Sequence, residues 1–461
     1  MPSFLTLTLG CKLNQLESEA ITCAFLNAGF APFPVGGGQI KTNGVQAEKN
    51  PSVVIVNTCT VTSKADQKAR RVIRKALRDY PDARVLVTGC YAQLNGEDLL
   101  KLDDGKKKRL FVVKKDGIID LPNYYGKNEQ SEQIDSILEK FSERGLVKTD
   151  DSVFQFNPLV FSSHTRSFLK IQDGCNNRCT YCRIRLARGA SVSLGADEAL
   201  SRLRILEKKH AEAVLTGVNI SQYRDEEKAA NLAKALEYFL KGTEKIALRL
   251  SSLAPEIIDE ELVGVLSNKR IRPHFHLSIQ SCSKNILEKM GRSYDGKTVE
   301  NAVSLLRRAK DDPFLACDII TGFPGETGTE FEETFELCKK LNFAWIHVFP
   351  YSKRPGTDAF SFPGMLHEAE VSRRVGLFTG LAQRGRAEYA RRWVGREIEV
   401  LVEKGGGKSC RGVCENYLKT LILYKGEHPS PGEVLRCRLL EKSSAEKSED
   451  YDLIAEASPI S

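Results

Sequence analysis

Three cysteines of this chain lie within a window of eight residues. The segment DGCNNRCTYCRIRLARG contains Cys175, Cys179 and Cys182 in the spacing C-x3-C-x2-C, which is tight enough for one metal centre to collect all three thiolates. A structural zinc site requires four protein ligands, and the nearest histidines in the sequence, His164 and His210, are not close by. An iron-sulfur cluster with three protein ligands instead leaves one iron open to a small molecule. The spacing therefore favours a cluster over zinc.

Three more cysteines follow strand-like segments in the N-terminal third. FLTLTLGC ends at Cys11, SVVIVNTC at Cys59 and RVLVTGC at Cys90, with helix-like segments between them. This alternation predicts a parallel sheet. Right-handed crossovers place the carboxyl ends of parallel strands at one edge, where open α/β sheets hold ligands. Any one of these cysteines alone would be better explained as a buried core thiol, but three at equivalent strand ends are expected to meet there.

Length and charge set the broad class. A chain of 461 residues is long enough for two to four domains of about 150 residues each. The 68 lysine and arginine residues exceed the 60 acidic ones by only eight, which weakly supports a nucleic-acid partner and is equally typical of a mixed, solvated surface. The N-terminus has no secretion signal, and no apolar stretch approaches the roughly 18 residues of a membrane span. We predict a cytoplasmic protein without a membrane partner, where clustered cysteines indicate metal binding or catalysis.

The middle of the chain repeats a strand and a helix about six times. The candidate strands are FLKIQDG, AVLTGVN, IALRLSS, HFHLSIQS, FLACDIITGFPG and WIHVFPYS. Six units are two short of a closed (β/α)8 barrel, so we expect a partial barrel, with its site at the carboxyl ends of the strands. The three-cysteine segment follows the first of these strands directly.

Five short strand patterns separated by glycine or proline turns follow near the C-terminus, and they predict a small all-β barrel. The predicted fold class is therefore α/β, with an N-terminal open parallel α/β sheet domain over residues 1–145, a central partial (β/α)6 barrel over 160–385 and a small all-β barrel over 393–459. Cys410 and Cys414 would face the same side of one strand, and Cys437 is expected in the core.

Several motifs resemble one known family. They are TLGCKLNQLESE, VIVNTCTVTSKADQKAR, VLVTGCYAQ, FLKIQDGCNNRCTYCRIRLARG, LTGVNISQY and DIITGFPGETGTEFEET, and they cover nearly the whole chain. Together they resemble the radical S-adenosylmethionine (SAM) superfamily and, within it, the methylthiotransferases. The small C-terminal barrel resembles the TRAM domain, an OB-like fold that these enzymes use on nucleic acid.

The resemblance implies two 4Fe-4S clusters, SAM as cofactor, and transferase activity on tRNA. Cys175, Cys179 and Cys182 would hold a cluster whose fourth iron is chelated by SAM, and electron transfer would release a 5′-deoxyadenosyl radical. A second cluster would be held by the three N-terminal cysteines, with an open iron for an exogenous sulfide that a further SAM methylates. A reduced electron donor of the flavodoxin or ferredoxin type is implied, and the sulfur donor is unknown. No catalytic residue is expected beyond the six cluster ligands.

Other residues at the expected barrel mouth fit a SAM pocket. A glycine lets backbone approach a ligand, and amide or hydroxyl side chains reach its polar groups. For each of them an ordinary strand-end turn, or packing beneath the loop for the tyrosine, is an equally good interpretation. The candidate cofactor-binding residues are Tyr181, Gly217, Asn219, Ser251, Ser252 and Gln280.

The sequence departs from the family pattern at two places. The family usually continues after the third cysteine with apolar residues and proline, whereas this chain has Arg183, Arg185 and Leu186. Cys282 stands where the family commonly has glycine. It is a tempting extra ligand, but we interpret it as a packed or solvent-facing thiol.

The substrate prediction depends on two of these motifs, TLGCKLNQLESE and IQDGCNNRCTYCRIRLARG. They are most similar to the branch of the family that acts on N6-threonylcarbamoyladenosine at position 37 of tRNA, beside the anticodon. A threonylcarbamoyl group carries a carboxylate, and Arg183, Arg185 or Arg188 could pair with it. These arginines could equally contact phosphates or SAM. The alternatives are isopentenyladenosine in tRNA, a ribosomal-protein aspartate, or an RNA-binding iron-sulfur sensor without enzyme activity.

Overall fold

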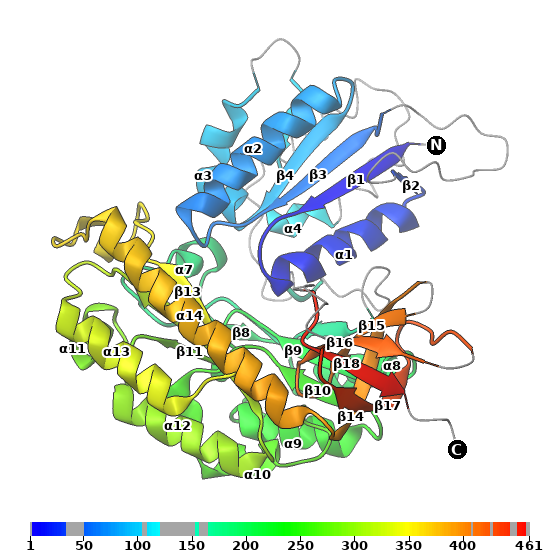
Figure 1. The fold of residues 1–461 in the computed structure, drawn as a ribbon. Coiled ribbons are helices and arrows are strands. Elements are labelled where there is room, and N and C mark those ends of the chain that lie inside the picture. The colour runs from blue at the N-terminus through cyan, green and yellow to red at the C-terminus, as the bar shows by residue number, and fades with distance from the viewer. Residues whose placement is uncertain are drawn as a thin grey trace. The chain divides into compact units, whose positions relative to one another are not determined.

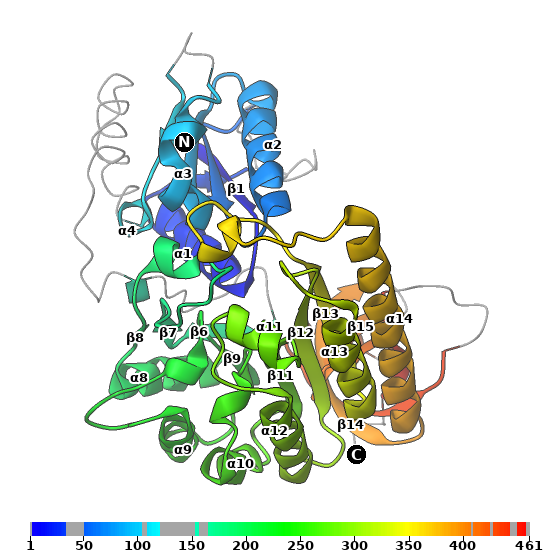
Figure 2. The ribbon, with the colours of Figure 1, turned by 90° about the vertical axis from the view of Figure 1, so that its left-hand side faces the viewer.

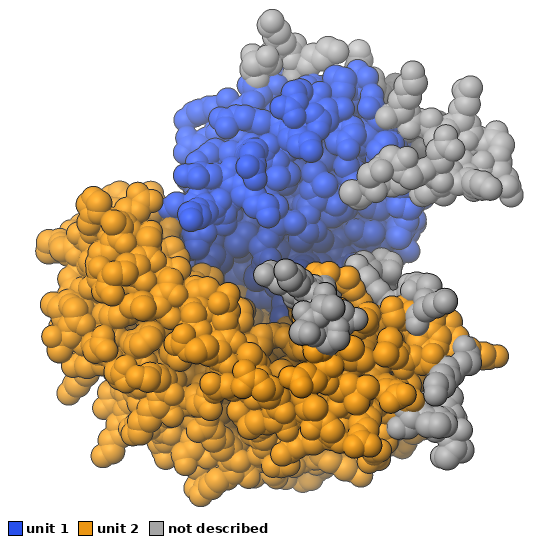
Figure 3. All heavy atoms as spheres, in the orientation of Figure 1, with its two compact units in different colours: residues 1–158, 173–176, 182–192 blue, residues 159–172, 177–181, 193–461 orange. Residues whose placement is uncertain are grey.

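The structure is a computed structural model that describes residues 2–33, 50–103, 108–119, 153–155, 165–406, 409–424, 427–442 and 450–457. The chain divides into two compact units (Figure 3). Unit 1 contains Met1–Pro158 together with Asp173–Asn176 and Cys182–Val192, and unit 2 contains the rest. The predicted domain boundaries at residues 145 and 160 lie outside the described residues, and the division into three domains stays a prediction.

Unit 1 is built on a five-stranded sheet with the order β2-β1-β3-β4-β5 (Figure 1). All neighbouring strands are parallel, as predicted. The strands are β1 Ser3–Thr8, β2 Ala31–Pro32, β3 Val53–Thr58, β4 Arg84–Gly89 and β5 Leu110–Val112. The helices are α1 Lys12–Asn27, α2 Ser63–Asp79, α3 Cys90–Leu100, α4 Lys115–Ile118 and α7 Ile184–Arg188.

The core of unit 1 follows from the strand and helix patterns. Every residue of β3, with the sequence VVIVNT, is buried, as expected for a central parallel strand covered on both faces. Helix α2 begins after Thr62, whose hydroxyl accepts a hydrogen bond from the Ala65 N–H at 3.1 Å. Its buried residues Ala69, Ile73 and Ala76 recur at helical spacing and pack in the same core as β3 and β4.

Unit 2 contains the six predicted strands as two parallel three-stranded sheets, β10-β9-β6 and β11-β12-β13. The Leu253 N–H donates to the His276 carbonyl at 2.8 Å and links the two sheets. Helices lie outside the strands, which gives the predicted partial barrel (Figure 2). The strands are β6 Ser167–Lys170, β9 Glu212–Thr216, β10 Ala247–Leu250, β11 His274–Gln280, β12 Phe314–Thr321 and β13 Trp345–Pro350. The helices are α8 Ala196–Glu207, α9 Leu232–Gly242, α10 Glu260–Leu266, α11 Lys284–Lys289, α12 Gly296–Ala309, α13 Gly328–Leu341 and α14 Glu368–Trp393.

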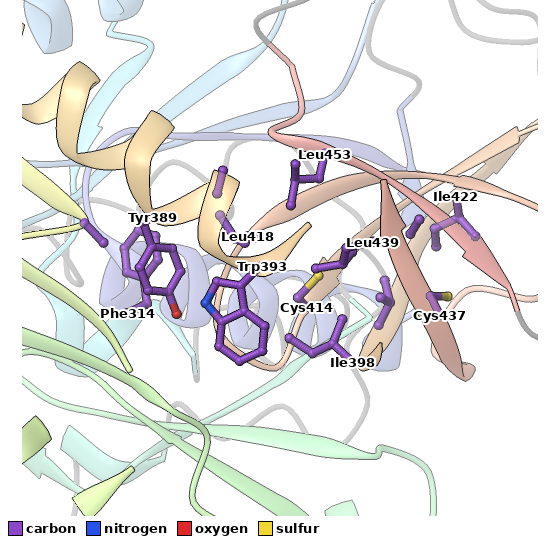
Figure 4. Close-up of a cluster of buried hydrophobic side chains, with 14 of the residues drawn as sticks. Phe314, Tyr389, Trp393, Ile398, Cys414, Leu418, Ile422, Cys437, Leu439 and Leu453 are labelled. Atoms are coloured by element: carbon purple, nitrogen blue, oxygen red, sulfur yellow. The ribbon is translucent and has the colours of Figure 1, made fainter. Parts of the chain in front are cut away.

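The C-terminal strands form the predicted small barrel, which is closed in the order β14-β15-β16-β18-β17. They are β14 Glu397–Gly406, β15 Ser409–Cys414, β16 Lys419–Leu423, β17 Val434–Leu440 and β18 Leu453–Ala457. Its core contains Cys410, Cys414 and Cys437, all fully buried. The same core continues into Phe314 of β12 and Tyr389 of α14 (Figure 4), so the small barrel shares its packing with the central strands.

A buried charge network joins the small barrel to the central strands. Glu212 of β9 forms ion pairs with Arg249 at 2.7 Å and with Arg272 at 3.1 Å. Arg272 also pairs with Glu399 of β14 at 2.8 Å. Burial by itself would raise the pKa of Glu212, but the two guanidinium groups lower it to about 2. The charged network and the shared core bind the small barrel firmly to the rest of unit 2.

Tyr417 of the small barrel closes the amino-terminal end of the partial barrel. It has a left-handed backbone (φ +74°), which is unfavourable for a tyrosine. Its ring lies 4.1 Å from the ring of His274 and 5.9 Å from that of Phe314, the first residues of β11 and β12. The guanidinium of Arg249 lies over the same ring at 5.3 Å. The opposite, carboxyl end of the strands is left for the site.

Candidate iron-sulfur sites

The structure brings the three N-terminal cysteines to one edge of the unit 1 sheet. Cys11 precedes α1 and follows β1, Cys59 directly follows β3, and Cys90 directly follows β4. The strands run in register, since Thr8 pairs with Asn57 and Thr58 pairs with Gly89. The three thiols thus lie at the carboxyl ends of adjacent parallel strands, as the sequence predicted.

Two glycines allow the loops at this edge to approach closely. Gly10 has a φ of +115°, and a Cβ there would lie 2.6 Å from the Cβ of Cys59. Gly89 has a φ of +96°, and a Cβ there would lie 2.3 Å from the Thr58 carbonyl oxygen. No other residue fits either position without moving the neighbouring cysteine loop, so each glycine is required next to a cysteine.

A pair of buried asparagines holds two of the loops together. Asn14 donates from Nδ2 to Oδ1 of Asn57 and to the Thr58 carbonyl, both at 3.0 Å. Asn57 donates back to the Asn14 carbonyl at 3.0 Å, and Oδ1 of Asn14 lies 3.3 Å from the Cys11 sulfur. Since buried amide groups are costly to leave without partners, this reciprocal pair stabilises the relative positions of Cys11 and Cys59.

The thiol of Cys59 is shielded from water. Burial raises its pKa to about 11, although a hydrogen bond from the Val61 N–H and the charge of Arg188 oppose the shift. The neighbouring thiols of Cys11 and Cys90 also raise the pKa of Cys59. A metal centre that binds Cys59 must displace the proton of its thiol.

Arg188 carries the positive charge closest to these thiols. Its Nε lies 3.3 Å from the Cys90 sulfur, and its Nη1 lies 3.0 Å from both Glu17 and Asp173. Lys115 pairs with Glu17 at 2.9 Å, so a buried arginine and a half-buried lysine face two buried carboxylates. Burial disfavours the guanidinium charge of Arg188, but Asp173, Cys90 and Glu17 raise its pKa well above the ordinary value.

The donor types at this edge suit an iron-sulfur cluster, whose irons are bound by cysteine thiolates. Among the described side chains, no three His, Cys, Asp or Glu residues are positioned to bind one metal ion. The N–H groups of Arg188 and Val61 donate to the sulfurs of Cys90 and Cys59, and hydrogen bonds of this kind are common at the sulfurs of iron-sulfur clusters. The donor set at this edge therefore fits an iron-sulfur cluster.

The C-x3-C-x2-C motif is held by backbone contacts in each unit. In unit 1, the Cys175 N–H donates to the Gly189 carbonyl at 3.1 Å, and a Cβ on Gly174 (φ +67°) would lie 1.8 Å from the Ala190 carbonyl oxygen. In unit 2, the Thr180 N–H donates to the Met290 carbonyl at 3.1 Å. Cys175, Cys179 and Cys182 are all half-buried, which suits ligands that must stay accessible to a small molecule.

Tyr181, the candidate inside the motif, packs against protein. Its hydroxyl accepts a hydrogen bond from Nη2 of Arg292 at 2.9 Å, and its ring meets Phe323 edge-on at 6.5 Å. It also borders a buried cluster that includes Met290 and Ala359. These contacts support the packing interpretation of Tyr181 and leave its role toward SAM a prediction.

The other SAM candidates lie at carboxyl ends of the barrel strands. A Cβ on Gly217, just after β9, would lie 2.8 Å from Oε1 of Gln172, and the same oxygen accepts the Asn219 N–H at 2.8 Å. Gln280 ends β11 with a φ of +67° and is buried. Ser251 and Ser252 follow β10 and are half-buried. The six candidates share one end of the barrel, and their contact with SAM stays a prediction.

A polar group that was not predicted from the sequence lies on the inner face of the partial barrel. His276 of β11 lies 3.0 Å from Asp318 of β12, at ion-pair distance but without hydrogen-bond geometry, and its ring stacks on His347 of β13 at 5.3 Å. The Trp345 indole N–H donates to Nδ1 of His347 at 3.2 Å, so the neutral ring of His347 carries its proton on Nε2. The available signal was the alternating polar residues of HFHLSIQ, together with Asp318 and His347 inside the mostly apolar strands FLACDIIT and WIHVFP.

Cys282 is a packed thiol, as interpreted from the sequence. It is buried, and a hydrogen bond with Cys338 together with burial raises its pKa well above the ordinary value. Cys317 of β12 is fully buried beside the same Cys338 of α13. The three cysteines thus pack between the strands and the surrounding helices, whereas Asp318, next to Cys317, faces the barrel interior.

The three arginines after the motif differ in their surroundings. Arg183 is buried and donates to Oδ1 of Asn95 at 3.3 Å. Arg188 is buried and pairs with the carboxylates of Glu17 and Asp173. Arg185 is half-buried, with its guanidinium on the Asn176 carbonyl at 3.2 Å, and Leu186 beside it is exposed.

Two family descriptions match the chain. Residues 169–338 match the radical SAM superfamily, and residues 3–110 match a family described as uncharacterized protein family UPF0004. The chain is 38% identical to the threonylcarbamoyladenosine tRNA methylthiotransferase MtaB of Treponema pallidum, over 91% of this chain and 94% of that protein. The MtaB of Bacillus subtilis is 31% identical over 94% and 93% of the two chains.

More distant matches include a second tRNA-modifying enzyme and a solved structure. The tRNA-2-methylthio-N(6)-dimethylallyladenosine synthase of Clostridium botulinum is 28% identical over 95% of this chain and 94% of that protein. The structure of the radical SAM methyltransferase TsrM from Kitasatospora setae, with cobalamin and a [4Fe-4S] cluster bound, covers 78% of this chain and 77% of its own with a TM-score of 0.51. At 15% identity, this structure supports the fold alone.

Proposed function

The chain belongs to the radical SAM methylthiotransferases, and from this premise we propose that it transfers a methylthio group to C2 of N6-threonylcarbamoyladenosine at position 37 of tRNA. The family makes the protein a transferase, with a 4Fe-4S cluster and SAM as its cofactors. We propose two clusters, one on each cysteine triplet, with SAM as both radical source and methyl donor. The observation that carries the proposal is the second triplet at the edge of the unit 1 sheet.

The residues around that triplet have distinct roles in the proposal. A cluster on Cys175, Cys179 and Cys182 supplies, when SAM is bound, the one-electron cleavage of the sulfonium bond. Cys11, Cys59 and Cys90 hold the second cluster, and Asn14 and Asn57 orient their loops. Arg188 donates toward the Cys90 sulfur and neutralises negative charge there.

The nucleoside assignment is supported by the more similar relatives. The relatives of 31% and 38% identity are named for threonylcarbamoyladenosine, whereas the one of 28% identity is named for dimethylallyladenosine. Of the three candidate arginines, Arg188 already faces two carboxylates and Arg183 is buried on Asn95. We assign the threonylcarbamoyl carboxylate to Arg185, because a guanidinium matches a carboxylate fork.

The remaining partners follow the same proposal. The small C-terminal barrel contacts tRNA, as its OB-like form suits, and a flavodoxin or ferredoxin delivers electrons in the cytoplasm. No described helix has the length and apolar character needed to cross a membrane.

Mass spectrometry of tRNA nucleosides from a strain lacking this gene tests the substrate. The 2-methylthio form of threonylcarbamoyladenosine should disappear while its unthiolated precursor accumulates. Loss of 2-methylthio-isopentenyladenosine or of a thiolated ribosomal protein would instead support the alternative substrates. Absence of 5′-deoxyadenosine after mixing reduced protein with SAM would favour the iron-sulfur sensor.

A further inference from the structure

Helix α2 presents a line of cations on its exposed side. Lys64, Lys68, Arg71, Lys75 and Arg78 are spaced by four, three, four and three residues, which places them on one stripe of the helix, and all are exposed. We call these five residues the α2 stripe. The opposite side of the helix packs in the unit 1 core, so the stripe has a fixed orientation.

The cations of the stripe are poorly neutralised. Helix α2 carries seven basic residues, and of its two acidic residues Asp66 is buried on Thr60. Asp79, at the end of the helix, pairs with Arg78 at 3.0 Å and lies 3.9 Å from Lys75. Among the described residues, no carboxylate pairs with Lys64, Lys68 or Arg71.

Many exposed cations on other helices of the chain have a carboxylate within 4.0 Å, as in the pairs Lys241–Glu237 on α9, Lys339–Glu336 on α13 and Arg373–Glu370 on α14. Exposed cations such as Arg204 of α8, Lys297 of α12 and Arg384 of α14 form no ion pair with a described carboxylate, but they are separate from one another, whereas three such cations follow each other along one side of α2. Like charges three and four residues apart destabilise a helix, and Lys64 also lies in the first turn, at the positive end of the helix dipole. An anionic partner along the stripe would relieve this repulsion.

The stripe begins at the cysteine edge of unit 1. Helix α2 follows the Cys59 loop, so Lys64 is only five residues from a predicted cluster ligand. The rise from Lys64 to Arg78 is about 21 Å at 1.5 Å per residue. A double-stranded nucleic acid carries a phosphate about every 3.4 Å along each strand, so the stripe is long enough for several phosphates in a row.

The composition of the stripe favours nucleic acid over protein. Its exposed residues are lysine and arginine with Gln67 between them, and no apolar side chain is exposed within it. Protein interfaces have cores depleted of charge and of lysine in particular, whereas phosphate contacts are made mainly by lysine and arginine.

We infer that the α2 stripe binds the phosphate backbone of the RNA stem that carries the substrate nucleoside. The inference rests on the proposed function and adds a second RNA-binding surface, on unit 1, to the small C-terminal barrel. The stripe holds the stem by charge while the nucleoside enters at the cysteine edge. It recognises phosphate spacing and not sequence, since phosphate contacts carry no base information.

The test uses the full-length, anaerobically reconstituted protein and an anticodon stem-loop RNA. The stripe variant combines Lys68→Gln, Arg71→Gln and Lys75→Gln. The control variant combines Lys241→Gln, Lys339→Gln and Lys340→Gln, exposed lysines of α9 and α13 with acidic partners. Both lower the net charge of +8 by three, so any difference between them reflects position and not total charge.

The stripe variant should bind the stem-loop at least about tenfold more weakly, and its slope of log affinity against log salt should be shallower by about three. The control variant should match the unmodified protein. Equal affinity and slope in all three proteins would overturn the inference. Absence of binding by the unmodified protein would overturn the proposed RNA substrate itself.

Two further measurements distinguish RNA binding by the stripe from a structural role and from binding of a protein partner. Removing like-charge repulsion should leave the melting temperature unchanged or raise it, and the charge-conserving variant Lys68→Arg, Arg71→Lys, Lys75→Arg should bind RNA normally. Weak binding and a lowered melting temperature in both variants would show a structural role. Unchanged RNA binding with slow reduction by flavodoxin, but normal reduction by dithionite, would assign the stripe to the electron donor.

Discussion

The two cysteine triplets of this protein are constructed in opposite ways. Cys175, Cys179 and Cys182 are neighbours in the sequence, and one short loop positions them. Cys11, Cys59 and Cys90 follow three different strands and meet only because those strands are parallel and in register. The first arrangement follows from closeness in the sequence, with backbone contacts such as that of Thr180 with Met290 holding the loop, and the second depends on the packing of an entire sheet.

The difference has an energetic consequence. The N-terminal triplet has two glycines with positive φ, a reciprocal asparagine pair and a network of four charged residues beside it. Cys59 and Cys90 are buried and Cys11 is exposed, whereas the three cysteines of the motif are all half-buried. Substitutions at the glycines and asparagines should therefore disturb the N-terminal triplet and spare the motif loop.

The largest expected effect comes from removing each triplet in turn. Replacing Cys175, Cys179 and Cys182 by alanine should remove about half of the roughly eight irons and all SAM cleavage. Replacing Cys11, Cys59 and Cys90 should remove the other half and stop methylthiolation, while 5′-deoxyadenosine still forms. Iron analysis and chromatography measure both. The matched control, Cys437→Ala, should keep all iron. Loss of all iron in either triple variant would show that the centres are not independent.

Arg188→Met should have the next largest effect. The variant leaves Glu17 and Asp173 buried with a single cation, Lys115, which should destabilise the protein by about 3–5 kcal/mol in urea denaturation. The electron paramagnetic resonance signal of the N-terminal cluster should change as well, because a hydrogen-bond donor to Cys90 is lost. Arg185→Met, on the same helix, serves as the control and should change stability by less than about 0.5 kcal/mol. Equal stability of the two variants would contradict the network.

Gly89→Ala tests the glycines without changing a ligand. The backbone conformation of Gly89, with φ +96° and ψ −175°, is essentially restricted to glycine and costs about 1–3 kcal/mol in an alanine, and the contact with the Thr58 carbonyl adds to it. Iron should be lost from the N-terminal triplet selectively, with SAM cleavage retained. Gly29→Ala is the control, since Gly29 has a φ of +87° but nothing within 4 Å of an added Cβ. If both variants keep full iron, the close approach of the loops is not needed for the cluster.

The smallest effect on stability is expected at Arg185, on the side of the motif loop. Arg185→Gln should leave the melting temperature nearly unchanged and raise KM at least about tenfold for RNA carrying threonylcarbamoyladenosine, because a charge-assisted hydrogen bond is lost. Arg185→Lys should restore part of the affinity. A fall in kcat at unchanged KM would argue against a contact with the substrate carboxylate.

Much of the fold was predictable because its signals are local. Apolar runs ending in cysteine located β1, β3 and β4, and the six strands of the partial barrel and five of the small barrel were found from alternation and turns. The meeting of Cys11, Cys59 and Cys90 was also predictable, because parallel strands share one carboxyl edge regardless of the distance between them in the sequence.

The sequence by itself therefore determined which cysteines form each set, which strands they follow and which family the chain resembles. Only the tertiary structure decided the partners of individual side chains. Arg188 was one of three candidate substrate contacts, and only the structure shows its ion pair with Glu17, which is far away in the sequence. His276 likewise lies at ion-pair distance from Asp318 and stacks on His347, across three strands. Periodicity tells which face a residue occupies, whereas an ion pair depends on side-chain direction and on which elements pack together, and those are properties of the folded chain.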